Sequence, residues 1–205
     1  MSLVVLGSAK GAPGVTTAVL ALAAVWPDGR DVMVVEADPD GGVIAARYRL
    51  PSEPGLATLA VAGRQALTSA TLVRHTQRLD DGGVRVLVAP PTAERSRRAL
   101  ALLGGRLGPL LAGLPATDVL VDAGRLSPDA PTEALQQAAD AVVLVARPRL
   151  DEIQSLGARV AALHSAGVAR MGLVLIGDRP YATDEVAEAL DTEVLGVLAD
   201  DRTAA

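Results

Sequence analysis

The sequence predicts an α/β fold in which a doubly wound, mostly parallel sheet carries helices on both faces. Short runs rich in Val, Ile and Leu alternate along the whole chain with longer segments rich in Ala, Leu and Arg. This alternation is typical of successive β–α–β units. Most of the short runs are apolar at successive positions, which indicates strands that are buried on both faces, as in a parallel sheet.

Seven strands are predicted from the apolar runs. They cover residues 3–7, 32–37, 84–89, 118–123, 141–146, 171–176 and 193–198. In open parallel sheets, ligands bind beyond the carboxyl ends of the strands, so the candidate site residues are sought there.

Six helices are predicted from the Ala-, Leu- and Arg-rich segments between the strands. They cover residues 16–26, 56–64, 93–103, 131–138, 150–166 and 183–190. Two segments rich in Pro and Gly, 49–57 and 104–116, interrupt this pattern and are predicted to be surface excursions or partner contacts. Neither segment marks a domain boundary, so residues 1–205 are expected to form a single domain.

Composition narrows the class of protein. Half of the 205 residues are apolar, enough for one sizeable core. The longest apolar run, residues 18–26, is far shorter than the roughly 20 residues that span a bilayer, so we expect a cytoplasmic protein without membrane insertion. The absence of cysteine excludes thiolate chemistry, and the only histidines, His75 and His164, are expected at the surface. The net charge of −5 argues against nucleic acid as a partner.

The loop AKGAPGVTT, residues 9–17, follows the first predicted strand and opens an apolar helix, which is the setting of a phosphate-binding loop. Backbone N–H groups and the positive end of the helix dipole bind anions there without help from a side chain. Gly11 and Gly14 permit close approach, and the Thr16 hydroxyl is a candidate ligand for Mg²⁺. The pattern G-x-x-x-x-G-K-[ST] is incomplete, because Ala9 stands at its first glycine and Val15 at its lysine.

Lys10 is the sole lysine among 19 basic residues. An ammonium and a planar guanidinium differ in shape, so a lone lysine in a glycine-rich loop indicates a site where arginine does not fit. The alternative is the chance survival of one lysine in an arginine-rich sequence.

These motifs resemble those of a known family. The stretch KGAPGVTT is similar to the deviant Walker A motif, K-G-G-x-G-K-[ST], of the ParA/MinD ATPases, which are P-loop NTPases, and Lys10 matches the family's signature lysine. Segments 34–42 (VVEADPDGG), 119–124 (VLVDAG) and 139–148 (ADAVVLVARP) resemble the family's second-strand motif, its Walker B strand and the strand that follows. The likeness covers essentially the whole chain. Residues 51–64 resemble TadZ/CpaE-like members, which help to place pilus or secretion machinery.

The resemblance implies a site for ATP or ADP with Mg²⁺. Lys10, which in the family reaches the phosphates of the facing subunit, and Asp38, which matches an aspartate near the attacking water, would be catalytic. The implied nucleotide-binding residues are Gly11, Ala12, Pro13, Gly14, Val15, Thr16 and Thr17, and the implied metal-binding residues are Thr16, Asp38 and Asp122. The reach of Lys10 also implies a homodimer. Simpler alternatives are an ordinary turn at 38–42 and a turn cap at Asp122.

Val15 weakens the expectation of an active enzyme, since losing a comparable phosphate-binding donor costs about 2.7 to 4 kcal/mol. The leading hypothesis is therefore a ParA/MinD-like, nucleotide-dependent dimerising switch with weak or lost ATP hydrolysis, which helps to organise cellular machinery in space through an unidentified protein partner. The alternative is a non-catalytic scaffold that binds protein partners without nucleotide. Metabolic ligases with the same loop form a third class.

Two further features of the sequence leave alternatives open, one for base recognition and one for contact with DNA. Relatives in the family commonly bind adenine through an Asn after the sixth strand, whereas residues 176–180 are IGDRP and the chain has no Asn, so its base specificity is open. Four arginines follow the third strand, and they either contact DNA phosphates, as in the ParA branch, or form a solvated helix face. They are Arg95, Arg97, Arg98 and Arg106.

Overall fold

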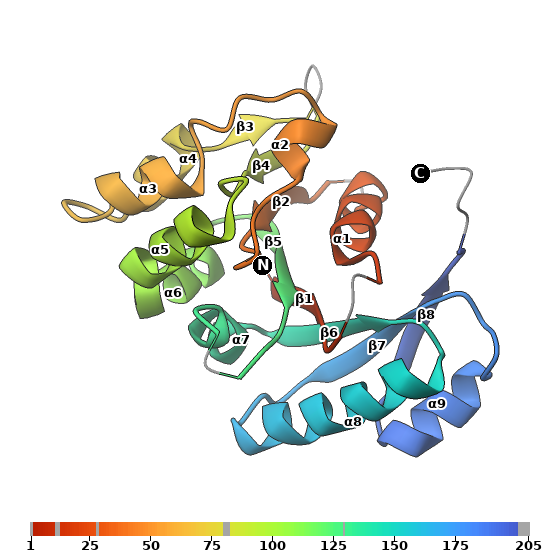
Figure 1. Cartoon of the computed structure of the whole chain (residues 1–205). Helices are drawn as coiled ribbons and strands as arrows, with labels where there is room; N and C mark the ends of the chain where they lie inside the picture. The colour runs from red at the N-terminus through yellow and green to blue at the C-terminus, as the bar shows by residue number, and fades with distance from the viewer. Residues whose placement is uncertain (1, 11–12, 28, 80–82, 129, 201–205) are drawn as a thin grey trace.

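The computed structural model describes residues 2–10, 13–27, 29–79, 83–128 and 130–200. Within them, eight strands form one sheet. The strands are β1 (Leu3–Ser8), β2 (Asp31–Glu36), β3 (Gln77–Arg78), β4 (Arg85–Leu87), β5 (Thr117–Arg125), β6 (Ala141–Ala146), β7 (Met171–Ile176) and β8 (Val194–Leu198). They lie in the order β3-β4-β2-β5-β1-β6-β7-β8 (Figure 1). All neighbours pair in parallel except the antiparallel pair of β3 and β4.

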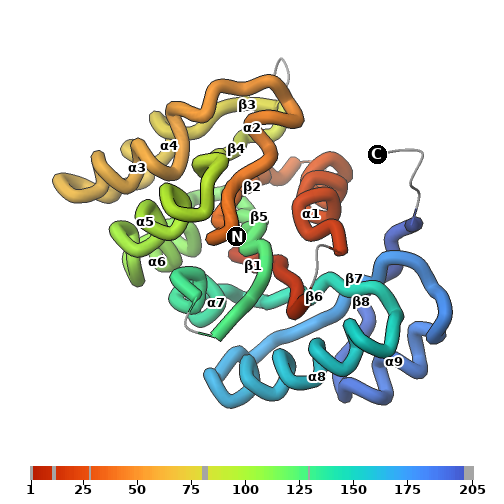
Figure 2. Tube along the Cα trace, in the orientation of Figure 1, coloured from red at the N-terminus to blue at the C-terminus, as the bar shows by residue number. Residues whose placement is uncertain are grey.

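Helices cover both faces of this sheet. They are α1 (Val15–Ala24), α2 (Ile44–Arg47), α3 (Leu56–Ala62), α4 (Ser69–Arg74), α5 (Ala93–Leu103), α6 (Leu107–Ala112), α7 (Glu133–Ala138), α8 (Leu150–Ser165) and α9 (Thr183–Leu190), with a 3-10 turn η1 (Gly104–Arg106) before α6. Figure 1 shows α1 and α2 on one face, and the tube in Figure 2 follows the chain onto the other face, where α5 to α9 lie. The predicted fold class, a doubly wound and mostly parallel α/β sandwich, is therefore confirmed.

The core divides along the sheet, because alternate side chains of each buried strand point to opposite faces. On one face, Val15, Val19 and Ile44 pack with strand residues such as Leu120. The larger cluster on the other face joins the sheet to α3 and to the helices from α5 to α9. No helix among the described residues is long and apolar enough to cross a membrane.

Each strand and helix predicted from the sequence is present, with ends that differ by a few residues at most. The sequence does not predict β3, α2, α4 or α6. The prediction of an irregular excursion over 104–116 is wrong for α6, whose Leu107 and Leu111 are buried in the core. Proline is tolerated in the first helical turn, where Pro109 lies, and a Cβ on Gly108 would come within 2.6 Å of the Ala138 Cβ, so this glycine permits close packing of α6 on α7.

Candidate functional site

The candidate residues after β1, β2 and β5 meet at one edge of the sheet. These three strands are neighbours, and their carboxyl ends point the same way because they pair in parallel. In the register of the sheet, Asp122 of β5 lies beside Leu6 of β1 on one side and Glu36 of β2 on the other. The loop that opens α1 and the loop after β2 therefore flank the end of β5.

A cavity of about 330 Å³ opens at this edge. It is lined by Ser8, Gly14, Val15, Thr16, Thr17, Asp38, Asp40, Val43, Arg47, Gly124 and Arg125. The lining combines a helix start, hydroxyl groups, two carboxylates and two guanidinium groups. This set of groups suits a ligand that carries both an anion and a metal cation.

Gly14 turns the chain into α1. Its φ of 107° lies in the left-handed region, which side chains other than glycine rarely adopt. No side chain caps the helix, and the residues of its first turn, Val15, Thr16 and Thr17, line the cavity. The positive end of the helix dipole and uncapped backbone N–H groups thus lie beside the cavity, as in an anion site.

Asp122 is fully buried beside this helix start. Its Oδ1 accepts a hydrogen bond from the Gly124 N–H at 3.0 Å, whereas its Oδ2 accepts none from any described residue. Burial raises the pKa of the Asp122 carboxyl and the Asp38 carboxylate raises it further, although the Thr16 hydroxyl, the Gly124 N–H and Arg47 lower it. Thr16 therefore lies close to Asp122 without completing a hydrogen bond to Oδ2.

A buried carboxylate oxygen without a partner, next to a threonine hydroxyl, fits a site for Mg²⁺. No group of three or more acidic or histidine side chains gathers as a metal site among the described residues. A divalent ion held by Thr16 and Asp122 would therefore need further oxygen ligands from a phosphate or from water.

Asp38 lines the same cavity. Its Oδ1 accepts a hydrogen bond from the Asp40 N–H at 2.8 Å, and its carboxyl packs against the Cα of Gly124, where any Cβ would overlap it. Gly124 also has a φ of 59°, which favours glycine. Burial raises the pKa of the Asp38 carboxyl, with Arg125 and Arg97 acting in the opposite direction. A turn is therefore present at 38–42, and the Asp38 carboxyl lines the cavity.

Glu36 stabilises the loop that carries Asp38. Its side chain is 1% exposed, and its two oxygens accept hydrogen bonds from the N–H groups of Val43 at 2.6 Å, Ile44 at 2.9 Å and Ala89 at 2.8 Å. Burial raises its pKa, while these three N–H groups lower it. Glu36 therefore acts as an internal support and does not line the cavity.

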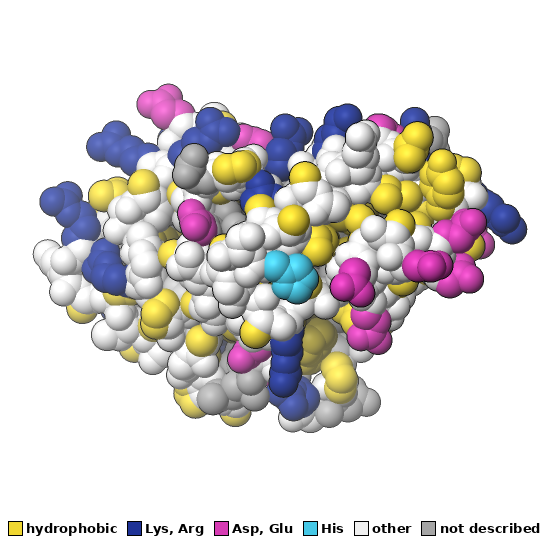
Figure 3. Space-filling view, turned by 90° about the horizontal axis from the view of Figure 1, so that it is seen from below, with side chains coloured by type: hydrophobic (Ala, Val, Ile, Leu, Met, Phe, Trp, Pro, Cys, Tyr) yellow, Lys and Arg dark blue, Asp and Glu magenta, His cyan; other side chains and the backbone are white. Residues whose placement is uncertain are grey.

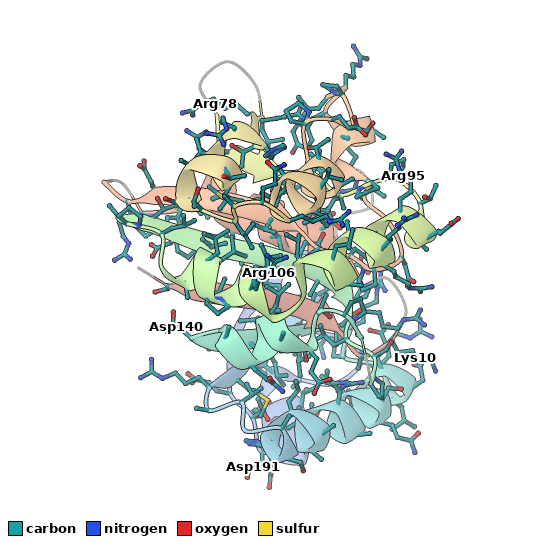
Figure 4. The ribbon with its side chains drawn as sticks, turned by 90° about the vertical axis from the view of Figure 1, so that its left-hand side faces the viewer. Lys10, Arg78, Arg95, Arg106, Asp140 and Asp191 are labelled. Carbon is teal, nitrogen blue, oxygen red and sulfur yellow. The ribbon has the colours of Figure 1, made fainter. Side chains whose placement is uncertain are left out.

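Val15 and Lys10 mark where the loop departs from its pattern. Val15 is 6% exposed and packs into the core beneath α1, with part of its surface on the cavity. Lys10 is exposed, and its Nζ lies 3.9 Å from the Asp151 carboxylate at the start of α8. Its side chain does not line the cavity within the described part of the chain. Figure 4 shows Lys10 at the same edge of the molecule, near α8.

The remaining predicted loop residues divide between the core and the surface. Pro13 is buried, and Thr17 is exposed and accepts a hydrogen bond from Arg47 Nη1 at 3.2 Å. Gly11 and Ala12 lie outside the described residues. The sequence analysis did not identify Arg47 and Arg125, which bring positive charge to the cavity from α2 and from the end of β5. No sequence motif marks these two arginines.

A second, larger cavity of about 1350 Å³ lies beyond the carboxyl ends of β6, β7 and β8. Its lining includes Arg147, Asp151, Asp178, Arg179, Pro180 and Tyr181. The segment 176–180, which has no Asn, forms one wall of this cavity. Asp151 connects the two regions, because it lines the larger cavity and also pairs with Lys10.

The arginines on and after α5 are exposed, and two of them pair with carboxylates. Arg95 lies 3.0 Å from Glu53, and Arg97 pairs with Asp40. His164 is exposed as expected. His75 is only half-buried rather than fully at the surface, since its Nδ1 shares a 2.7 Å hydrogen bond with the Thr58 hydroxyl.

No protein-family model matches the sequence, and no curated protein matches it. Solved structures do match. A ParA family ATPase from Chlorobium tepidum superposes with a TM-score of 0.76 at 17% identity, over 99% of this chain and 85% of that one. The cell division ATPase MinD of Pyrococcus furiosus gives 0.76 at 20% identity, over 98% and 84% of the two chains.

The septum site-determining protein MinD of Pyrococcus horikoshii, in complex with Mg-ADP, also superposes with a TM-score of 0.76, at 18% identity and over 98% of this chain and 82% of that one. At these identities the likeness concerns the fold. The chain therefore shares the α/β fold of the ParA/MinD P-loop ATPases.

Proposed function

We propose that this chain is a ParA/MinD-like switch that binds ATP or ADP with Mg²⁺, dimerises on the nucleotide and hydrolyses it slowly or not at all. The observation that carries the proposal is the buried Oδ2 of Asp122, which accepts no hydrogen bond from the described residues and lies near Thr16 at the start of α1. The shared fold supports it, because the matching MinD from P. horikoshii was solved with Mg-ADP.

In this proposal, the start of α1 binds the phosphates. Gly14, Thr16 and Thr17 contribute the backbone N–H groups, and Arg47 and Arg125 add positive charge. Gly11, Ala12 and Pro13 complete the loop. Bound Mg²⁺ would neutralise charge on the phosphate oxygens.

Thr16 and Asp122 hold the cation in this scheme, and Asp38, whose charge acts on the Asp122 carboxyl, lines the same cavity as Thr16. A carboxylate with a raised pKa, as at Asp38, is suited to accept a hydrogen bond from a water molecule and orient it. Asp38 is therefore the group proposed to position the attacking water and to complete the metal site.

Val15 is the reason to propose slow turnover. An apolar side chain that is 6% exposed supplies no positive charge to the phosphates. Lys10 projects outward toward Asp151 rather than into the cavity. From this exposed position the lysine is free to serve the phosphates of a second copy, which is why we propose a homodimer.

We further propose that the nucleotide base occupies the larger cavity beside β7, where Tyr181 and Asp178 stand in the absence of any Asn. A cytoplasmic role in the spatial organisation of cellular machinery, such as pilus assembly, and a protein partner complete the proposal. These parts rest on the family resemblance.

The test is a titration of fluorescent ATP and ADP, with Mg²⁺ and with EDTA. Asp122→Asn should weaken binding of the Mg²⁺ complex by about tenfold or more, while binding in EDTA changes little. Asp191→Asn is the matched control, because Asp191 is exposed at the end of α9, far along the chain from the cavity. If the wild-type protein binds neither nucleotide, the scaffold hypothesis replaces this one.

Dimerisation is tested separately by sedimentation with and without Mg·ATP. The wild-type protein should double in mass with Mg·ATP, and Lys10→Ala should remain a monomer while still binding nucleotide. A Lys10→Ala variant that dimerises on ATP would refute the role proposed for this lysine, and leave nucleotide binding intact.

A further inference from the structure

A third cavity lies at the other end of the sheet. Its volume is about 790 Å³, and it is bounded by the starts of β2, β4 and β5, by α4 and by β3. In Figure 4, Arg78 of this cavity lies on the same side as Asp140, which precedes β6, whereas Lys10, which follows β1, lies on the opposite side. The cavity is therefore separate from the proposed nucleotide site.

Four arginines from different elements converge on this cavity. Arg30 precedes β2, Arg74 ends α4, Arg78 belongs to β3 and Arg85 starts β4. Asp31 is the one acidic residue in the described lining. Asp80 and Asp81, in the segment between β3 and β4, lie outside the described residues. The described lining is thus strongly positive within a chain whose net charge is −5.

Three of these guanidinium groups bond only to neutral acceptors within the described part of the chain. Arg74 donates to the Thr71 hydroxyl at 3.4 Å. Arg78 donates to the Gly83 carbonyl at 3.0 Å, and Arg85 donates to the Thr76 hydroxyl at 3.2 Å. Because each guanidinium carries five N–H donors, most of these donors have no partner among the described residues.

Some arginines elsewhere in the molecule pair with carboxylates. Arg95 pairs with Glu53, Arg97 with Asp40 and Arg149 with Asp151. Arg30 in the cavity itself pairs with Asp118. Arg74, Arg78 and Arg85 have no carboxylate partner among the described residues, and they come from three different elements to line one cavity.

Part of the lining is apolar, and we call this part the floor of the cavity. It consists of Val32, Met33, Val73, Val84, Leu114 and Pro115. Val73 is 42% exposed, so it is available to a ligand. A ligand that contacts both the arginines and the floor must combine carboxylates or phosphates with apolar groups.

We propose that this cavity binds an acidic peptide segment of a protein partner, with Glu or Asp side chains at the arginines and an apolar side chain on the floor. Arginine binds carboxylates through two parallel hydrogen bonds, which suits such a segment. A free phosphate would leave the apolar floor unused.

Nucleic acid fits the surroundings less well. No aromatic residue lines the described cavity for base stacking. Acidic residues also cover α9, and Figure 3 shows acidic side chains gathered at one side of the face that α8 and α9 present. This acidic part of the surface would repel a nucleic acid backbone.

The test is fluorescence anisotropy with a labelled peptide of repeating Glu-Glu-Leu, and with a matched peptide in which Gln replaces Glu. The wild-type protein should bind the Glu peptide in a saturable and salt-sensitive way, at least about tenfold tighter than the Gln peptide. Arg78→Gln combined with Arg85→Gln should weaken binding about tenfold, and Arg74→Gln provides an independent single change. Arg98→Gln, at an exposed arginine of α5, is the control and should bind as the wild type does.

Equal binding of the two peptides, no binding of the Glu peptide, or full binding by the folded double variant would each overturn the proposal. Single-stranded DNA that binds more tightly than the Glu peptide, and is lost in the double variant, would assign the cavity to nucleic acid instead. The Asp122→Asn variant should still bind the peptide, so the outcome is independent of the nucleotide site.

Discussion

Two buried aspartates on β5, Asp118 near its start and Asp122 near its end, have opposite surroundings. Both side chains point to the α1 face of the sheet, since they are an even number of residues apart on one strand. The helix α1 begins beside Asp122, and the chain that leaves this helix supplies Trp26 and Arg30 to Asp118. The comparison thus holds residue type, strand and neighbouring helix constant.

Asp118 is saturated with donors. Its Oδ2 accepts hydrogen bonds from Arg30 Nε at 2.6 Å and from Trp26 Nε1 at 3.0 Å, and its Oδ1 accepts one from Arg30 Nη2 at 2.6 Å. The Arg30 hydrogen bonds lower the pKa of the Asp118 carboxyl to about 2, against the opposing effect of burial. This aspartate stabilises the folded chain.

The buried charge of Asp122, by contrast, destabilises the folded chain. Burial raises its pKa, and one of its oxygens lacks a partner among the described residues. A buried polar group that the fold does not satisfy is unusual, and such groups concentrate at functional sites. The difference between the two ends of β5 therefore separates a structural ion pair from the proposed binding site.

The largest effect is expected from Val15→Lys, which would bring to Asp122 a charge comparable to the one that Arg30 brings to Asp118. The lysine stem can lie along the apolar surface while its ammonium reaches the cavity. Nucleotide turnover should rise by about tenfold to a thousandfold, and the free energy of unfolding should fall by about 1 to 2 kcal/mol because Val15 is buried. Steady-state ATPase kinetics measure the gain, with Ala24→Lys, at an exposed position of α1, as the control that should not raise turnover; unchanged affinity and rate for Val15→Lys would favour the scaffold hypothesis.

The next largest effect is a loss of stability at Asp118, near the start of β5. Arg30→Ala should remove the two hydrogen bonds that the buried Asp118 carboxylate accepts from Arg30, and clearly lower the free energy of unfolding. Urea denaturation measures the change. Arg149→Ala is the control, because its pair with Asp151 is exposed at both ends, and removing it should cost less than about 0.5 kcal/mol.

A smaller change in the free energy of unfolding, of opposite sign, is expected at Asp122. Asp122→Asn removes a buried charge while its side-chain oxygen can still accept from the Gly124 N–H, so the nucleotide-free protein should become more stable by about 1 kcal/mol. Thermal unfolding without nucleotide measures it. A clear loss of stability would show that Asp122 is a structural residue like Asp118.

The smallest effect is the pH dependence of what Asp118 and Asp122 contribute to the free energy of unfolding. The pKa of Asp118 lies below its unfolded value of about 3.9, so its contribution is present above that pH and is lost as the pH falls to about 2. The pKa of Asp122 is raised, so its cost is present at high pH and disappears as the pH falls through the folded-state pKa toward about 4. The free energies of unfolding of Asp118→Asn, Asp122→Asn and the wild type are measured at several pH values. The difference between each variant and the wild type should shrink in the pH window given for that aspartate. Differences that do not change with pH would contradict the assignment.

Sequence analysis predicted the edge of the sheet where the site lies, but not how its groups are arranged. The loop at 9–17 and the aspartates Asp38 and Asp122 end predicted strands, and these strands are neighbours in the sheet. The buried side chain of Glu36, the ion pair of Lys10 with Asp151 and the position of Arg47 at the cavity were not predicted. Each depends on contacts with segments that are remote in sequence.

By itself, the sequence determined the succession of strands and helices and the position of the glycine-rich loop between β1 and α1. Those properties follow from apolar patterning and from glycine, which act over a few neighbouring residues. Only the tertiary structure decided that Asp118 is ion-paired while Oδ2 of Asp122 has no partner among the described residues, because Arg30 lies 88 positions from Asp118 along the chain. A carboxylate acquires its pKa and its role from the groups that the fold brings to it, and a local pattern does not contain them.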